Sequence, residues 1–123
     1  MTITDGGRNL LASAIKGDKT GGFNAFNKIN IGESGGNTDP TLNDLDLPII
    51  SAPVTLDSIS LSNDNVVEFY KTFSGDTYSG SVIREVGIYD SSAAIMLLRV
   101  TTDPIGPLEA GKNYEIRITI EVE

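Results

Sequence analysis

Among its 123 residues the chain has no cysteine, no histidine and no tryptophan. Without cysteine it has no disulfide framework, no thiolate nucleophile and no zinc–thiolate site. Without histidine it lacks the commonest general base near neutral pH and the commonest transition-metal ligand. A serine hydrolase would then need a Ser–Lys pair, which is an uncommon arrangement. We therefore expect no enzyme.

Short sequence motifs typical of catalytic or cofactor-binding sites are equally scarce. The stretch GESGG around Ser34 resembles a nucleophile elbow only if its spacing is ignored, and no histidine is present to complete a triad. The glycine-rich stretches lack the strand-to-helix setting of a phosphate-binding loop. We expect no catalytic residue, no cofactor and no bound metal.

The charge balance limits the partners. Seventeen acidic and nine basic residues give a net charge of −8, and such a surface repels phosphate. We expect neither nucleic acid nor an anionic membrane as a partner. No apolar run reaches the length of a membrane span, and the N-terminus has neither a basic start nor a signal cleavage site. The chain is therefore expected to be made in a cytoplasm.

The first half of the chain predicts a helix and a long loop. Residues 1–17 carry an apolar stripe, and Thr4 or Asp5 can cap this helix. Residues 32–48 are rich in glycine, proline and acidic side chains, which predicts a long surface loop. Its Asp and Asn residues could ligate calcium, but their spacing fits no calcium-loop pattern, and their turn-forming tendency explains them without a metal.

The remainder is patterned for strands. Residues 25–31 and most of the chain from residue 49 alternate between apolar and polar, most cleanly at 114–122. A shift of phase near Asp57–Ser58 predicts a bulge or a strand that changes partners. Asp103–Pro107 is expected to break the sheet. The pattern predicts one domain over residues 1–123: a mainly β, small antiparallel β-sandwich of about six strands with one N-terminal α-helix.

The stretch SVIREVGIYD places an opposite-charge pair inside an apolar strand. Alternation puts Arg84 on the face of Val86 and Ile88, where a charge must be paired, so an acidic partner is expected. Glu85 falls on the opposite face with Tyr89. The glycine between them, Gly87, would allow a backbone or an aromatic ring to approach closely.

The apolar run IMLLRV at residues 95–100 admits two interpretations. It is a central core strand, or it is buried against a symmetry mate.

The order of these features resembles the N-terminal domain of tail-fibre and tail-collar proteins of tailed viruses. In that family a helix with the pattern ITxxG…LLA precedes a strand ending in glycine and an acidic residue, a proline-containing loop, and a hallmark strand IRE(I/V)G(L/I)(F/Y)D followed by a return strand. Here ITDGGRNLLA, Ile31–Glu33, Pro40–Leu47, Ile83–Asp90 and MLLRV match these parts in turn.

The resemblance implies a structural component of a tailed virus particle. Such a protein acts by self-assembly and by docking to other virion proteins, in the tail, baseplate or fibre-attachment region; a capsid-surface subunit, as a turret or decoration, is the alternative. Because family members usually carry a long fibre shaft after this domain, a chain of this length is expected to be a stand-alone virion protein. The expected location is the virion, after synthesis in the host cytoplasm.

The resemblance also implies partners and residues. A homo-oligomer is expected, with a trimer favoured, and a host surface glycan or receptor is a further candidate partner. The residues expected to have structural or assembly roles are Arg84, Glu85, Gly87, Tyr89, Asp90, Leu97 and Arg99.

A hypothesis from a different class is a carbohydrate- or calcium-binding β-sandwich module. Its site would be the 33–47 loop, and it is motivated by the acids of that loop and by Tyr70, Tyr78 and Tyr89, which it takes to be exposed.

Overall fold

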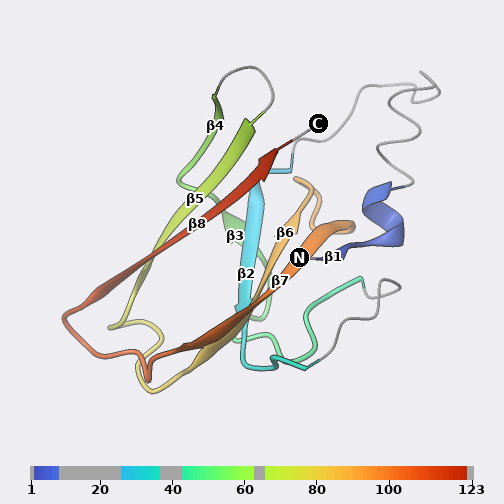
Figure 1. Cartoon of the computed structure of the whole chain (residues 1–123). Helices are drawn as coiled ribbons and strands as arrows, with labels where there is room; N and C mark the ends of the chain where they lie inside the picture. Colours follow the sequence, from blue (N-terminus) through green and yellow to red (C-terminus); the bar gives the residue numbers. More distant parts are fainter. Residues whose placement is uncertain (1, 9–25, 37–42, 63–65, 122–123) are drawn as a thin grey trace.

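A computed structural model describes residues 2–8, 26–36, 43–62 and 66–121. Within them, eight strands form two antiparallel sheets (Figure 1). The five-stranded sheet has the order β1 (Thr2–Ile3), β7 (Met96–Ile105), β6 (Ile83–Tyr89), β2 (Lys28–Gly32), β3 (Val54–Thr55). The three-stranded sheet has the order β4 (Ser58–Ser62), β5 (Val66–Ser74), β8 (Asn113–Glu121).

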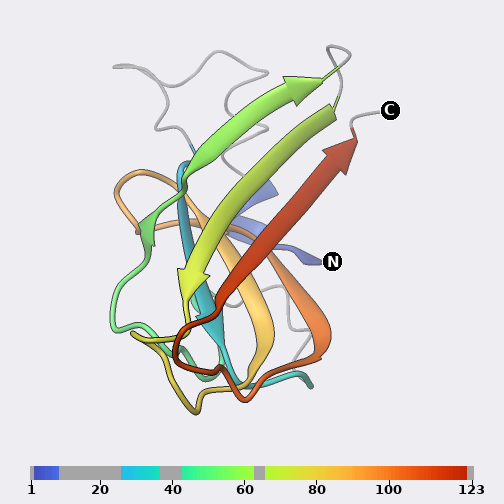
Figure 2. The ribbon, with the colours of Figure 1, turned by 90° about the vertical axis from the view of Figure 1, so that its left-hand side faces the viewer.

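The two sheets pack face to face, which confirms a mainly β, small sandwich-like fold (Figure 2). Six of the strands have five or more residues, in agreement with the predicted number. The other two, β1 and β3, have two residues each and are too short to give a readable alternation.

The core lies between the sheets because both sheets turn aliphatic and aromatic side chains inward. The five-stranded sheet contributes Ile31, Val86 and Leu98, while the three-stranded sheet contributes Phe69 and Ile118. In β8 the inward residues alternate with exposed ones, as its sequence predicts. Burial of this apolar surface is the main favourable term for the fold.

The predicted phase shift near Asp57 is a change of sheet. Strand β3 pairs with β2 in the larger sheet, and β4, which starts three residues after β3 ends, pairs with β5 in the smaller one. Because the side chains of a strand alternate between its two faces, a segment that passes from one sheet to the other must shift its apolar phase to keep facing the core.

The run IMLLRV is a core strand of this chain. Met96, Leu97 and Leu98 are all buried: Leu98 packs in the core between the sheets, Met96 packs with Leu45 and Tyr89, and Leu97 lies against Gly7. The chain itself therefore covers both faces of this run, and no symmetry mate is needed to bury it.

The predicted break at Asp103–Pro107 is present, since β7 ends at Ile105 within this range, although Asp103 and Pro104 still belong to the strand. Strand β7 continues through Pro104 to Ile105, and its pairing with β6 shifts register between Ile83 and Glu85. A proline is tolerated in a strand where the ladder is irregular, since no ladder hydrogen bond is then required of it.

The start of the predicted helix 1–17 lies within the described residues. Residues 5–8 are helical, and the Thr4 hydroxyl accepts a hydrogen bond from Gly7 N at 3.0 Å, which makes Thr4 the N-cap. The same hydroxyl donates to the Met96 carbonyl, so the cap also fixes this helical turn to β7. Residues 9–17 of the predicted helix lie outside the described residues.

Within the described part of the chain, no helix has the length and apolar character to cross a membrane.

Candidate functional site

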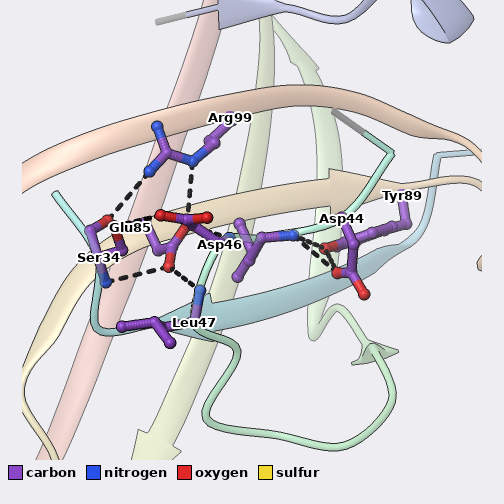
Figure 3. Close-up of polar contacts among 8 residues, drawn as sticks. Ser34, Asp44, Asp46, Leu47, Glu85, Tyr89 and Arg99 are labelled. Carbon is purple, nitrogen blue, oxygen red and sulfur yellow. Dashed lines mark hydrogen bonds and ion pairs between the residues drawn. The ribbon is translucent and has the colours of Figure 1, made fainter. Parts of the chain in front are cut away.

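A buried carboxylate, Glu85, lies on the side of the five-stranded sheet that faces away from the core. Its side chain is 0% exposed. One oxygen, Oε2, accepts hydrogen bonds from Ser34 N at 3.1 Å and Leu47 N at 2.9 Å, and Oε1 accepts one from Asp46 N at 3.0 Å (Figure 3). A carboxylate thus binds the backbone on both sides of the predicted 32–48 loop.

The positive partner of Glu85 is Arg99 on the neighbouring strand β7. Its Nε lies 3.0 Å from Glu85 Oε1, and its Nη2 donates to the Ser34 carbonyl at 3.0 Å (Figure 3). Arg99 is 3% exposed, so both charges are removed from water. We call Glu85, Arg99 and the backbone groups of Ser34, Asp46 and Leu47 that they bind the loop anchor.

The main effect of the loop anchor is to fix the position of the backbone. Burying an ion pair costs desolvation energy that its attraction and hydrogen bonds offset only when they are well placed. Here one carboxylate accepts four hydrogen bonds, three of them from backbone N–H groups. The anchor therefore fixes the path of two loop segments rather than presenting a charge to solvent.

Backbone hydrogen bonds close the base of the loop below the anchor. Glu33 N donates to the Leu47 carbonyl at 2.9 Å, and Ile49 N donates to the Ile31 carbonyl at 2.8 Å. Gly32 is required at this point because a Cβ there would lie 2.6 Å from Glu85 Cγ. A side chain at position 32 would displace the carboxylate.

A second buried group, next to the anchor, consists of Leu45, Tyr89 and Met96. The hydroxyl of Tyr89 donates to Asp44 Oδ1 at 2.5 Å and accepts a hydrogen bond from Leu45 N at 3.3 Å (Figure 3). Burial, and then the hydrogen bond to Asp44, raises the pKa of Tyr89 above its ordinary value of 10. The phenol therefore stays neutral and holds the loop at a second point.

The expected close approach at Gly87 is present. A Cβ there would lie 3.0 Å from the Tyr89 ring, from Leu45 Cδ2 and from Met96 Sδ. The absent side chain makes room for the aromatic ring and the loop leucine.

The last residue of the hallmark, Asp90, orders the turn between β6 and β7. Its Oδ1 accepts hydrogen bonds from Ala94 N at 3.0 Å and Ile95 N at 3.1 Å, and the Ser92 hydroxyl donates to both of its oxygens. Ala93 adopts a positive φ of 60° in this turn. An aspartate that binds backbone N–H groups supports such a turn.

The prediction for the Arg84–Glu85 pair is wrong about which charge is buried. Arg84 is half-buried and makes no ion pair with the described residues, while Glu85 is fully buried. The reason is that both faces of β6 are covered, one by the smaller sheet and the other by the loop, and that the register shifts after Ile83.

The structure brings five of the seven predicted residues to one side of the sheet and its adjoining turn: Glu85, Gly87, Tyr89, Asp90 and Arg99. Leu97 belongs to the central core, where its backbone also contacts Gly7. Their roles in assembly stay predictions.

Sequence reasoning considered the acids of this loop only as possible calcium ligands, and it missed the contacts that the loop makes with Glu85 and Tyr89. Asp44, Leu45 and Asp46 contribute a carboxylate, an apolar side chain and a backbone N–H group respectively. An isolated leucine in this acidic loop is no reliable signal, because Leu45 is 5% exposed while Leu47, two residues later, is 59% exposed.

The tyrosines do not form an exposed platform. Tyr89 is 1% exposed, which overturns its assumed exposure. Tyr70 is half-buried, hydrogen-bonds Glu115 at 3.0 Å and lies under the Arg117 guanidinium at 4.4 Å, and Tyr78 packs edge-on against Phe73. In the described portions of the loop and sheets, no three acidic side chains are grouped as a metal site would require.

Comparisons with models of protein families, with curated proteins and with solved structures found no match for this chain.

Proposed function

We propose that this protein is a structural component of a tailed virus particle. It acts by self-assembly and by docking to other virion proteins in the tail, baseplate or fibre-attachment region. The proposal starts from the resemblance of Ile83–Asp90 and its flanking segments to the tail-fibre and tail-collar domain. A capsid-surface subunit is the alternative position on the particle.

One structural observation supports this proposal. Within the described ranges, all five buried polar side chains hydrogen-bond the backbone: Thr4, Asn30, Glu85, Asp90 and Arg99. Catalysis needs such groups aimed at a substrate, with shifted pKa values and mutual geometry. In this protein they fix loops and turns on a rigid sandwich, as an assembly subunit with defined contact surfaces requires.

The hallmark residues fit this role. Glu85 and Tyr89 bind the loop 32–48 at four backbone N–H groups and one carboxylate, and Asp90 binds the adjoining turn. The side chain of Leu47 in this loop is 59% exposed. An apolar side chain on the anchored segment 43–48 lowers the entropy that docking to a neighbouring protein would cost.

The test is the protein composition of purified virus particles. We expect this chain in mass spectra of density-purified virions at a constant ratio to the major capsid protein, and immunogold labelling at the tail. Labelling over the capsid surface would select the alternative position. Absence from purified particles would overturn the proposal.

The glycan or calcium alternative has lost part of its support. Its Tyr89 is buried, and the carboxylates of Asp44 and Asp46 are hydrogen-bonded to Tyr89 and Ser34. Saturable calcium binding or a glycan-array signal that is lost on changing the 33–47 loop would restore it.

A further inference from the structure

Strand β4 is an open edge of the three-stranded sheet. It pairs on one side with β5, from Ser58 opposite Tyr70 to Ser62 opposite Val66, and on the other side no described strand pairs with it (Figure 2). An edge strand carries unpaired backbone N–H and C=O groups, which form a template for another strand.

The four sheet edges in the described residues differ in how they are protected. Strands β1 and β3, which are the edges of the larger sheet, have two residues each. Strand β8 is long, but it carries Glu115, Arg117 and Glu121. Short length and charge are the usual devices that prevent edge pairing.

Strand β4 has neither device. Its sequence SISLS contains no charge and no proline, and residues 58–61 are all exposed. Ile59 is 43% and Leu61 65% exposed, although they pair with Phe69 and Val67 of the core-facing side. The apolar inner face of the sheet therefore extends past the core to this edge.

We propose that β4 pairs with β4 of a second copy, antiparallel and centred on Ser60. The result is a six-stranded sheet across two copies related by a twofold axis. In this register Ile59 lies opposite Leu61 of the second copy, Ser60 lies opposite Ser60, and Ser58 lies opposite Ser62. The alternation of serine and aliphatic residues is thus complementary to itself.

Charge favours a second copy at this edge. The chain has a net charge of −8, so two copies repel each other over most of their surfaces. Strand β4 carries no charge, so two copies can approach each other there without bringing like charges together. Antiparallel pairing is also slightly more stable per residue than the parallel pairing that a β4-to-β8 contact would require.

This contact does not depend on the virion role. A pair of five-residue strands forms a small interface, so we expect weak dimerisation. A separate trimer contact on another surface would combine with it to give a hexamer. We therefore expect pairing through β4 to double the mass of the oligomer that forms through any other contact.

The test uses Ser60→Lys, which places like charges directly opposite each other across the proposed axis. Light scattering and sedimentation over a concentration series should give the wild type a mass that is an even multiple of 13.1 kDa. Ser60→Lys should halve that mass or weaken the association about tenfold, since like charges directly opposite destabilise a strand pair. Ser60→Glu alone should do the same, and an equimolar mixture of the two variants should restore the doubled mass.

The matched control is Thr119→Lys, which places the same charge at an exposed position of the other edge, β8. It should leave the mass unchanged, whereas a β4-to-β8 contact would be weakened by both lysine variants. A wild type with an odd mass multiple at millimolar concentration would overturn the proposal. So would a folded Ser60→Lys variant that retains the wild-type mass, or a mixture that does not recover.

Discussion

The anchored loop and the β4 edge use the hydrogen bonds of the backbone in opposite ways. At the loop, three backbone N–H groups converge on Glu85, and Arg99 binds a carbonyl. At β4, one row of backbone groups is left without a strand partner among the described elements. The chain thus places buried charges where a loop must be immobile and neutral side chains where a further strand can be added.

The largest expected effect comes from removing the positive charge of the loop anchor. Arg99→Met should lower the free energy of unfolding by about 3–5 kcal/mol, because it leaves the Glu85 carboxylate buried without its cation. Urea unfolding followed by circular dichroism measures this. The matched control is Arg84→Met, on the neighbouring strand, which should change stability by less than about 0.5 kcal/mol. Equal losses in the two variants would contradict the assignment of Arg99 as the partner.

A smaller loss of stability is expected from a substitution at Gly32, where the loop backbone approaches Glu85. Gly32→Ala should destabilise the protein by about 1–3 kcal/mol, since the new Cβ overlaps the carboxylate side chain and forces it to move. Gly36→Ala in the same loop meets no atom within 4 Å and serves as the control. The same unfolding measurement applies. A Gly32→Ala variant as stable as Gly36→Ala would show that the Glu85 side chain can move without loss of stability.

Removal of one hydroxyl should have a still smaller effect, and one that depends on pH. Tyr89→Phe should cost about 1 kcal/mol at neutral pH through the lost hydrogen bond to Asp44. The pKa of Tyr89 is raised in the folded state, so its stabilisation is complete below pH 10 and declines as the pH rises above that value, where the unfolded chain ionises. The stability difference between wild type and variant should therefore shrink above pH 10. A difference that stays constant from pH 8 to 11 would contradict the buried, neutral phenol.

The smallest expected effect belongs to the β4 edge. Ser60→Lys, at dilution where the chain does not associate, should change the free energy of unfolding by less than about 0.5 kcal/mol, because Ser60 is exposed. Thermal and urea unfolding at low protein concentration give the comparison. A loss of stability as large as that of Gly32→Ala would mean that Ser60 contributes to folding as much as the loop anchor does. It would contradict the proposed difference between the two regions.

The sequence was sufficient for the sandwich because most strands bury one face. In β8 the alternation of Ile116 and Ile118 with charged residues gives the strand directly. The sheet change near Asp57 was visible as a change of phase for the same reason.

The loop anchor could not be predicted because β6 is covered on both faces. Alternation cannot then identify the outer face, and it points to Arg84 as the buried charge where the structure buries Glu85. The partners of Glu85 are backbone N–H groups, and every residue except proline has one. Sequence therefore carries no mark of which ones are bound.

The loop anchor also has a consequence for the order of folding. Ser34 and Leu47 bind Glu85, which lies 51 and 38 positions further along the chain, and Ser34 binds Arg99, 65 positions further. Thr4 binds Met96 across 92 positions. Such distant contacts require the closure of long chain segments and slow folding. Because Ser34 and Leu47 are synthesised before Glu85 and Arg99, we expect the anchored loop segments to become ordered only after β6 and β7 have joined the sheet.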